Sequence, residues 1–447
     1  MSLLCRSGYI VADTKEVRKE LSVRPVVIGD FGFPPPPFKV FKLSKSGLCT
    51  PRFWAEEKFG PAETDKRVEP TRVNFTFTGK LRDETFQNEA LKKGIEAGHG
   101  VLSLPCGFGK TTVSLAIAAK LGLRTMIIVH KEFLATQWAE RIQQFCPGAT
   151  IGRVQQDRVE VNCDFVITML QSLASKEYET NQFESIGTVL VDEAHHICAR
   201  VFSQALFKIC PKHIFGLSAT PDRKDGLTKV LNWFMGPIFF AVEREHQKQV
   251  DVITLQFDCR MFHEPPPTTR FGKLNLPAMI TELCENEARN AVIVSTIREI
   301  LGTNRQLLVL SDRRLHCEHL FFEFTDEQAG LYMGGMKQKD LAESSKKRVI
   351  FATFSQAHEG LDIPSLDTVF LVTPKSDIKQ SIGRIMRETT GKKNTPKIYD
   401  VVDHWSVMFA MFNKRKRVYR EGGFNIVGPP DPQTKAEENP FKGKCHL

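Results

Sequence analysis

A glycine-containing turn stands between two runs of different character. The run at 101–104 is short and apolar, which is typical of a buried strand, and the run at 113–120 is typical of a helix. Such a turn directs backbone N–H groups at one point, where the positive end of the helix dipole also favours a chain of phosphates. Lys110 would reach the outer phosphates, and the Thr111 hydroxyl would hold Mg²⁺. This phosphate turn, residues 104–112, supplies Gly107, Gly109, Lys110, Thr111 and Thr112.

The first position of the phosphate turn departs from the usual pattern. That pattern opens with glycine or alanine, and this chain has Leu104 there. Both glycines of the turn are kept, so we expect the turn to keep its shape. Gly-Lys-Thr occurs by chance in many loops, and the prediction therefore depends on further motifs downstream in the chain.

Two adjacent carboxylates, Asp192 and Glu193, follow the apolar run 188–191. Because that run predicts a buried strand, the carboxylates emerge at the edge of the sheet, where the phosphate turn must also lie. There Asp192 would hold Mg²⁺ through water, and Glu193 would orient and deprotonate the attacking water. Adjacent acids are common on protein surfaces, but this position indicates hydrolysis of a nucleotide phosphate.

Further polar residues stand near the ends of predicted strands, where open parallel sheets place their ligands. Thr168 and Gln171 follow one such strand and are candidates for contacting the phosphates of a nucleic-acid strand; the alternative is a plain turn. Ser218 and Thr220 follow another, and their hydroxyls would link the nucleotide site to the nucleic-acid side. Gln87, upstream of the phosphate turn, has an amide that matches the edge of an adenine; the alternative is an ordinary surface residue.

The elements that hold these residues alternate between strands and helices from Gly79 onward, and two such series follow one another. The alternation predicts two doubly wound α/β domains with parallel sheets. The predicted strands are 101–104, 125–130, 165–169, 188–191 and 213–217 in the first series, and 306–311, 348–353 and 368–372 in the second.

Composition sets limits on the partners of the chain. Of its 447 residues 41% are hydrophobic, enough for the cores of several domains. The formal charge of +9 suits a partner with a phosphate backbone, although ordinary solubilising charge explains it as well. The 11 cysteines include no Cys-x-x-Cys pair, which favours free thiols in a reducing, intracellular compartment. No apolar run approaches the roughly 20 residues of a membrane span.

The cluster His316-Cys317-Glu318-His319 contains residue types that bind metals. A structural zinc site needs a second pair of ligands, and none stands near this cluster in the sequence. We therefore expect these residues to pack on or within a helix.

Taken together, three blocks resemble the motifs of the superfamily 2 helicases and translocases. Motif I is Gly107–Thr111, motif II is Asp192–His195 and motif III is Ser218–Thr220. The resemblance extends over about residues 79–420. It is nearest to the XPB-like and UvsW-like branch, which includes the transcript-release helicases of large DNA viruses.

This resemblance implies two tandem RecA-like domains, ATP and Mg²⁺ as cofactors, and coupling roles for His195, Ser218 and Thr220. It also implies nucleic-acid contacts at Arg223 and Thr353. The XPB-like branch has an Arg-Glu-Asp motif tied to DNA opening. This chain has lysine in its second position, directly after Arg223, so the DNA-opening role is not transferred.

The second series carries further matches. Gly360 and Asp362 match motif V, which in the family contacts ribose and nucleic acid. Gln380, Arg384 and Arg387 follow the order Gln-x-x-Gly-Arg-x-x-Arg on one predicted helix, where the arginines share a face. In the family that face stabilises the transferring phosphoryl group, and an arginine finger is worth about 10³–10⁵ in rate. The alternative is a solvated basic helix face.

These matches divide the chain into five parts. Residues 1–78 form a small β-rich accessory domain, with nucleic-acid binding as one interpretation. Residues 79–245 are the first RecA-like domain, which binds ATP, and 286–425 are the second. Residues 246–285 are a linker between the domains, and 426–447 are a flexible tail.

The sequence therefore predicts an ATP-dependent motor that moves along nucleic acid and unwinds it. DNA is favoured over RNA, and the resemblance implies 3′-to-5′ travel. Repair, recombination or transcription, a larger transcription or repair complex, and a viral origin are further expectations. The alternatives are a duplex translocase that does not separate strands, an RNA helicase, and a non-catalytic scaffold, against which intact Lys110, Glu193 and Arg387 argue.

Overall fold

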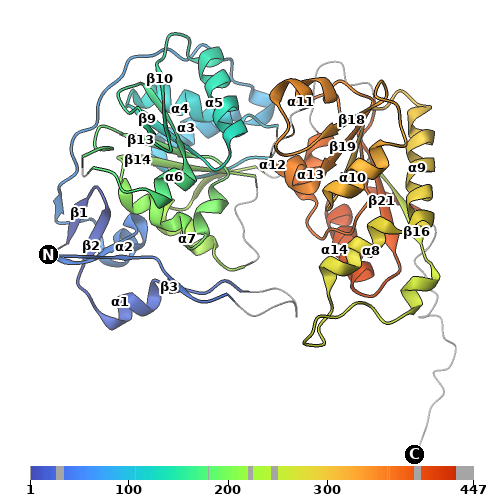
Figure 1. The fold of residues 1–447 in the computed structure, drawn as a ribbon. Helices are drawn as coiled ribbons and strands as arrows, with labels where there is room; N and C mark the ends of the chain where they lie inside the picture. The colour runs from blue at the N-terminus through green and yellow to red at the C-terminus, as the bar shows by residue number, and fades with distance from the viewer. Residues whose placement is uncertain are drawn as a thin grey trace, which may run out of the picture. The chain divides into compact units, whose positions relative to one another are not determined.

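The chain forms two compact units, Met1–Arg244 and Glu245–Leu447, drawn in Figure 1. The structure is a computed structural model, and it describes residues 2–26, 35–105, 107–179, 181–219, 225–242, 250–359, 361, 363–386 and 394–428. Within these ranges, none of the helices is both long and apolar enough to cross a lipid bilayer.

The N-terminal part of unit 1 is a small sheet with two short helices. Its elements are β1 (Leu3–Cys5), β2 (Gly8–Val11), α1 (Lys15–Glu20), β5 (Lys42–Ser44), β6 (Gly47–Thr50), α2 (Arg52–Phe59) and β7 (Thr64–Asp65), with the separate pair β3 (Ser22–Val23) and β4 (Phe38–Lys39). The five strands run in the order β5-β6-β2-β1-β7. Leu4, Tyr9, Leu48 and Trp54 pack into one core, so this small sheet has an interior of its own.

The small sheet is joined to the rest of unit 1 by specific contacts. The ring of Phe53 stacks on His99, with ring centroids 4.3 Å apart. The guanidinium groups of Arg52 and Arg67 both donate to the carbonyl of Pro211, at 3.4 and 2.8 Å. The small sheet is therefore part of the same compact unit as the large sheet that comes after it in the chain.

The large sheet of unit 1 has eight strands: β8 (His99–Ser103), β9 (Thr125–Val129), β10 (Ile151–Gln155), β11 (Arg158–Val159), β12 (Phe165–Met169), β13 (Thr188–Val191), β14 (His213–Ser218) and β15 (Ile238–Ala241). They lie in the order β11-β10-β12-β9-β13-β14-β8-β15, and all are parallel except β11. Every residue of β9 and β13 is buried. Strands that are apolar on both faces belong inside a sheet covered on both sides.

Helices cover both faces of this sheet (Figure 1). They are α3 (Gln87–Ala97), α4 (Lys110–Leu121), α5 (Glu132–Phe145), α6 (Leu170–Ser175) and α7 (Thr228–Met235), with the 3-10 helices η1 (Asp83–Thr85), η2 (Ala194–Cys198) and η3 (Phe202–Lys208). Along β8, Leu102 joins the core formed with α3, α4 and α5, and Val101 joins the core formed with α6, α7, η2 and η3. Neighbouring residues thus serve opposite faces, as a doubly wound sheet requires.

Unit 2 has a seven-stranded sheet that is parallel throughout, in the order β18-β19-β17-β20-β21-β16-β22. Its strands are β16 (Asp251–Phe257), β17 (Leu307–Ser311), β18 (Ala329–Tyr332), β19 (Val349–Thr353), β20 (Thr368–Leu371), β21 (Lys397–Asp403) and β22 (Asn425–Val427). Its helices are η4 (Arg260–His263), α8 (Leu276–Glu285), α9 (Glu287–Leu301), α10 (Arg314–Phe321), α11 (Gln338–Ser344), α12 (Phe354–Glu359), α13 (Lys379–Ile385) and α14 (Val407–Glu421). One core gathers α9 and α10, and another gathers α12, α13 and α14.

The two parallel sheets share one strand order. Counted along the chain within each sheet, and leaving out the hairpin strand β11, both run third, fourth, second, fifth, sixth, first, seventh. The same connectivity in both units means that one fold occurs twice in tandem. The predicted fold class, two doubly wound α/β domains in tandem, is confirmed.

Residues 246–285 differ from the predicted linker. The described part of this segment contributes β16, which pairs with β21 from Asp251 to Phe257 and lies between β21 and β22. Val252 and Thr254 of β16 are buried, so the strand is an integral part of the second sheet. The prolines at 265–267 lie in a loop, and this loop follows the first strand of unit 2 and does not precede it.

Two buried ion pairs fix helices of unit 2 to β21. Arg289 of α9 donates to both carboxylate oxygens of Asp403, at 2.7 and 2.9 Å. Arg415 of α14 donates to Asp400 at 2.9 Å, and the Tyr419 hydroxyl donates to the same carboxylate at 2.7 Å. Buried charges are tolerated only when they are paired and hydrogen-bonded, so these contacts specify where both helices pack.

The cluster from His316 to His319 packs as predicted. The His316 ring lies 2.9 Å from the Asn290 amide oxygen and 2.9 Å from the Ser311 hydroxyl, and Cys317 is buried. Burial lowers the pKa of His316 to about 3, so the ring is neutral. Across the described ranges, no group of three or more His, Cys, Asp and Glu side chains is arranged to hold a metal ion.

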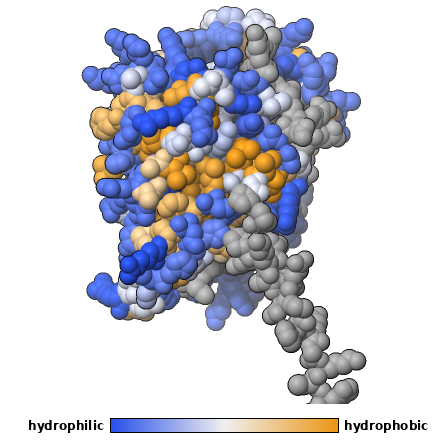
Figure 2. Space-filling model, turned by 90° about the vertical axis from the view of Figure 1, so that its right-hand side faces the viewer, coloured by the Kyte–Doolittle hydropathy of each residue, from blue (hydrophilic) through white to orange (hydrophobic). Residues whose placement is uncertain are grey.

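Part of the surface of unit 2 is apolar. Figure 2 shows the side of the molecule that lies to the right in Figure 1, with hydrophobic residues gathered in its middle and hydrophilic residues around them. The most exposed large apolar side chains of the described part of unit 2 are Phe271, Leu315 and Phe322. Unit 2 therefore keeps apolar side chains outside its cores.

Candidate nucleotide-binding site

The phosphate turn links β8 to α4 through two glycines in the left-handed region. Gly107 has φ +88° and Gly109 has φ +83°. A Cβ atom added at Gly109 would come within 2.4 Å of Nε2 of Gln87, so a larger residue here would both strain the backbone and force the Gln87 amide to move. The turn thus keeps the backbone shape that the sequence predicted.

Leu104 and Lys110 hold the two ends of the turn together. Leu104 is fully buried, and its N–H donates to the carbonyl of Ser218 at 3.3 Å, which anchors the start of the turn to β14. The Lys110 ammonium donates to the carbonyl of Leu104 at 3.0 Å. The departure from glycine or alanine at position 104 is therefore accommodated by the core, and the lysine side chain folds back over the turn.

Gln87 supports the turn from α3. Its Nε2 donates to the carbonyl of Phe108 at 2.9 Å, and its Oε1 accepts from the N–H of Arg82 at 3.0 Å. The side chain is 1% exposed. Gln87 thus lies directly against the phosphate turn, with its amide bonded to the turn; the adenine contact inferred from sequence stays a prediction.

Asp192 and Glu193 stand at the carboxyl end of β13. One oxygen of Asp192 accepts from the indole N–H of Trp138 at 2.8 Å, and the other accepts from the N–H of Glu193 at 3.0 Å. Burial raises the pKa of Asp192, and the Glu193 carboxylate adds to the rise, while the Trp138 hydrogen bond and the charge of Lys110 act in the opposite direction. Lys110 is therefore close enough to Asp192 for their charges to interact, so the phosphate turn and the acidic pair belong to one site.

Trp138 is a site residue that the sequence analysis did not single out. It lies on α5 and is 2% exposed. A buried indole N–H requires an acceptor, and that requirement is the signal that could have directed attention to Asp192.

Glu193 has a strained backbone, with φ +45°. Non-glycine residues with positive φ are uncommon and gather at functional sites. A carboxylate oxygen of Glu193 lies 3.5 Å from Nδ1 of His195. The His195 ring in turn packs on His196, and His196 packs on His130, with ring centroids 4.4 and 3.9 Å apart. The predicted coupling residue His195 therefore lies next to Glu193, the predicted catalytic base.

The remaining polar candidates of unit 1 have different surroundings. Ser218 is buried at the end of β14. Gln171 is exposed, and its amide donates to the carbonyl of His130 at 2.5 Å. Thr168 is fully buried, and its hydroxyl has no hydrogen-bond partner among the described residues. Thr168 is thus enclosed in this conformation whereas Gln171 is exposed, and the contact of either residue with a nucleic-acid strand stays a prediction.

In unit 2, Arg384 lies on α13 and is 9% exposed. Its Nε donates to the carbonyl of Ala357 at 2.8 Å, which ties α13 to α12. Thr353 ends β19, and its hydroxyl lies 3.1 Å from that of Ser355. The predicted site residues Thr220, Arg223, Gly360, Asp362 and Arg387, and the side chain of Gln380, lie outside the described residues.

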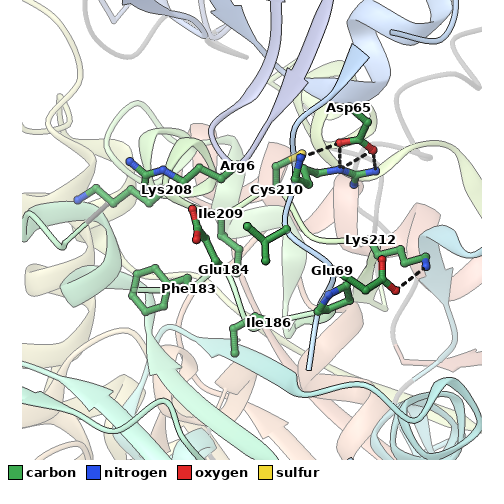
Figure 3. Close-up of a pocket in the computed structure, with 13 residues that line it drawn as sticks. Arg6, Asp65, Glu69, Phe183, Glu184, Ile186, Lys208, Ile209, Cys210 and Lys212 are labelled. Atoms are coloured by element: carbon green, nitrogen blue, oxygen red, sulfur yellow. Dashed lines mark hydrogen bonds and ion pairs between the residues drawn. The ribbon is translucent and has the colours of Figure 1, made fainter. Parts of the chain in front are cut away.

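A separate pocket of about 160 Å³ is lined by residues of the small N-terminal sheet and its connections and by residues around η3, shown in Figure 3. Two pairs of its charged residues are engaged with each other: Asp65 accepts from Arg67 at 2.7 Å, and the Lys212 ammonium lies 3.5 Å from Glu69. No residue of the nucleotide site lines it. The pocket therefore belongs to the junction of the two sheets of unit 1.

The chain is similar to several known proteins. Residues 80–223 match the family described as type III restriction enzyme, res subunit. The chain is 34% identical to L396 of Acanthamoeba polyphaga mimivirus, named as an ATP-dependent RNA helicase, over 95% of this chain and 86% of that protein. It is 30% identical to the helicase-named 161L of Invertebrate iridescent virus 6, over 78% of this chain and 83% of that protein.

Two more distant similarities complete the comparison. QP509L of African swine fever virus (strain Badajoz 1971 Vero-adapted), named as an ATP-dependent RNA helicase, is 23% identical over 74% of this chain and 70% of that protein. The crystal structure of T4 UvsW matches with a TM-score of 0.38 and 17% identity, over 96% of this chain and 98% of that one. The family assignment rests on the sequence relatives. The chain belongs to the superfamily 2 helicases, nucleic-acid-dependent ATPases, and is related to these viral members.

Proposed function

We propose that unit 1 binds ATP with Mg²⁺ at the phosphate turn and that Glu193 activates the attacking water. The observation that carries the proposal is the convergence of Lys110, Asp192 and Glu193 at the carboxyl edge of one parallel sheet. Asp192 is fixed by Trp138, and its pKa responds to Lys110. Three charged groups held together beside a left-handed glycine turn suit phosphate chemistry better than any structural role.

The residues present fit a magnesium ion. Thr111 offers a hydroxyl oxygen and Asp192 a carboxylate, which are the hard oxygen ligands that Mg²⁺ prefers. Each Asp192 oxygen already accepts one hydrogen bond, which fixes the carboxylate and leaves further lone pairs for water or metal. When bound, Mg²⁺ would offset the negative charge of the phosphates.

Each side chain of the proposed site has one task. Lys110 leaves the carbonyl of Leu104 and pairs with the outer phosphates. Glu193 accepts a proton from the water that attacks the terminal phosphate. Its strained backbone and its contact with His195 hold the carboxylate in place. Arg384 and Arg387 contribute guanidinium charge to the transferring phosphoryl group, a proposal supported by their match to the family motif.

We propose further that hydrolysis drives movement along DNA in the 3′-to-5′ direction, with strand separation. RNA is the second candidate substrate, because two of the relatives, L396 and QP509L, are named as RNA helicases. Translocation on duplex DNA without strand separation is the third. A larger transcription or repair complex stays a prediction.

Glu193→Gln tests the catalytic assignment. We expect the nucleic-acid-stimulated turnover of ATP to fall by about 10²–10⁴, because the amide cannot accept the proton of the water. Binding of a fluorescent ATP analogue should be kept, since the phosphate turn is unchanged. Glu177→Gln is the matched control, because the Glu177 side chain is 96% exposed. Turnover of Glu193→Gln within twofold of the unsubstituted chain would contradict the proposal.

Substrate choice is tested with the unsubstituted chain. ATPase stimulation by single-stranded DNA, duplex DNA and RNA is measured side by side, and we expect single-stranded DNA to be the strongest activator. Unwinding of 3′-tailed but not 5′-tailed duplexes is the expected polarity. Displacement of a triplex strand without unwinding of a duplex would instead support the duplex translocase.

A further inference from the structure

An open groove of about 400 Å³ lies on unit 2, and none of the residues that line it was assigned to a site from the sequence. Three segments line it: 304–306, 345–348 and 363–365. The first two lead directly into β17 and β19, and the third ends shortly before β20. Because these strands are parallel, the groove lies at their amino ends.

The groove has a fixed floor. The Gln306 amide nitrogen donates to the carbonyls of Ser345 and Lys347, at 2.9 and 2.8 Å. The Gln306 amide oxygen accepts from the Ser365 hydroxyl at 2.5 Å. One side chain thus ties together all three segments, so the shape of the groove is built into the fold.

The lining is strongly basic. Arg305, Lys346, Lys347 and Arg348 line the groove, and no carboxylate does so among the described residues. Asp367 lies 3.7 Å from Arg305 and is 4% exposed. This buried carboxylate offsets one of the four positive charges. Three positive charges are left at the groove.

These three cations are not engaged with acids in the described part of the chain. The Arg348 guanidinium donates to the carbonyls of Leu301 and Arg305, at 3.2 and 3.1 Å, and the Lys347 ammonium donates to the carbonyl of Asp326 at 2.6 Å. Carbonyls position these groups without neutralising them. Lys346 is exposed, and its ammonium makes no hydrogen bond or ion pair with any described residue.

We propose that this groove is a second nucleic-acid-binding surface, which holds the sugar-phosphate backbone of a strand through Lys346, Lys347 and Arg348. A polyanion is the occupant that an acid-free groove with three unneutralised cations favours. The inference rests on the proposed function in one respect, that the motor works on nucleic acid. Contacts to phosphates carry no base preference, so binding here is independent of sequence.

The groove is separate from Thr353, one of the predicted nucleic-acid contacts of unit 2. Thr353 ends β19 at its carboxyl end, whereas Arg348 stands just before the amino end of the same strand. A strand of five residues spans roughly 16 Å, so the two places lie at opposite edges of the sheet. A single nucleic-acid strand that contacts both Thr353 and the groove would have to pass around unit 2. A second segment, such as a displaced strand or flanking duplex, reaches the groove directly.

Lys346→Ala with Lys347→Ala tests the proposal in the full-length chain. The probe is labelled oligothymidine, and its affinity is measured by fluorescence anisotropy from about 0.05 to 1 M salt. Loss of two phosphate contacts should lower the slope of log affinity against log salt by about 1.4. When salt is lowered from 1 M to 0.1 M, the affinity of the double variant should therefore rise roughly 25-fold less than that of the unsubstituted chain. The ATPase rate at saturating DNA should be unchanged, because neither lysine belongs to the nucleotide site.

Lys414→Ala with Arg417→Ala is the matched control. Both residues are exposed on α14 of the same unit, and the pair removes the same charge. A slope change confined to the Lys346 and Lys347 pair supports the groove. Equal slopes in all three proteins would overturn the proposal that the groove binds nucleic acid. An acidic protein segment would then be the occupant that its charge favours. A chain that binds oligothymidine but hydrolyses no ATP would overturn the proposed motor, and the slope comparison would still decide the groove.

Discussion

At the scale of single residues, Gly109 shows how tightly the nucleotide site is specified. Its backbone is left-handed, and a Cβ atom added there would come within 2.4 Å of the Gln87 amide, which would have to move. Gly148 has nearly the same backbone, with φ +86°, but nothing lies within 4 Å of the point where its Cβ atom would stand. Substitutions at Gly109 and Gly148 can therefore distinguish the effect of backbone strain from the effect of packing against the phosphate turn.

Gly109→Ala should therefore cost more function than Gly148→Ala. Both substitutions place alanine in a left-handed conformation, at about 1–2 kcal/mol of stability each. Only Gly109→Ala also displaces Gln87 from the turn, and a displacement on the order of 1 Å lowers the DNA-stimulated ATPase rate roughly 100-fold. Steady-state ATPase and thermal unfolding of both variants check this. Equal ATPase losses in the two variants would show that strain alone is responsible.

At the scale of elements, His316 connects three of them. The ring sits on α10 and bonds to Ser311, which ends β17, and to Asn290 of α9. A neutral ring can donate from one nitrogen and accept at the other, and both partners are then satisfied. A charged ring could not accept from the Ser311 hydroxyl, so this junction depends on a neutral histidine.

The stability of this junction should fall in acid. The pKa of His316 is about 3 in the folded chain, against an ordinary value of 6.5. Below pH 6.5 the unfolded chain binds a proton that the folded chain does not. The contribution of His316 to the free energy of unfolding is therefore fully present above pH 6.5. It falls by about 1.4 kcal/mol per pH unit between pH 6.5 and 3.

Hydrogen exchange of peptides from α9, β17 and α10 measures this local stability at pH 6.5 and 5.5. His316→Gln should remove most of the decrease between the two pH values, whatever its effect on absolute stability. His319→Gln is the control, because His319 is exposed on the same helix. A pH dependence that persists unchanged in His316→Gln would assign it to another group.

Sequence reasoning succeeded where an element's own residues decide its structure. The apolar runs at 125–130 and 188–191 predicted β9 and β13, because a strand buried on both faces has to be apolar throughout. It failed for β16, whose place is decided by distant partners: β21 and β22 flank it, and both lie far along the chain. The hydrogen bond from Trp138 to Asp192 was missed for the same reason, since it spans 54 positions.

At the scale of the whole molecule, buried ion pairs hold the second unit together. Arg289 and Asp403 are both 0% exposed, and they join α9 to β21. Removing one partner leaves a buried charge without compensation, which is more costly than the loss of the bond itself.

Asp403→Ala should destabilise unit 2 by about 3–5 kcal/mol, whereas Arg289→Met combined with Asp403→Leu should cost far less. Urea unfolding followed by hydrogen exchange of unit 2 peptides measures both. The double variant is the control for charge, since it fills similar volume without ions. Equal destabilisation by the two would mean that packing, not the unpaired charge, sets the loss.

The shared strand order of the two sheets has a consequence for stoichiometry. β16 holds the place in the second sheet that β8 holds in the first, so the connection after β16 is the topological twin of the phosphate turn. The residues that directly follow β16, Asp258-Cys259-Arg260, include neither glycine nor lysine, and η4 begins at Arg260. We therefore expect one nucleotide site for each polypeptide, at the phosphate turn of unit 1, and one ATP hydrolysed in each cycle.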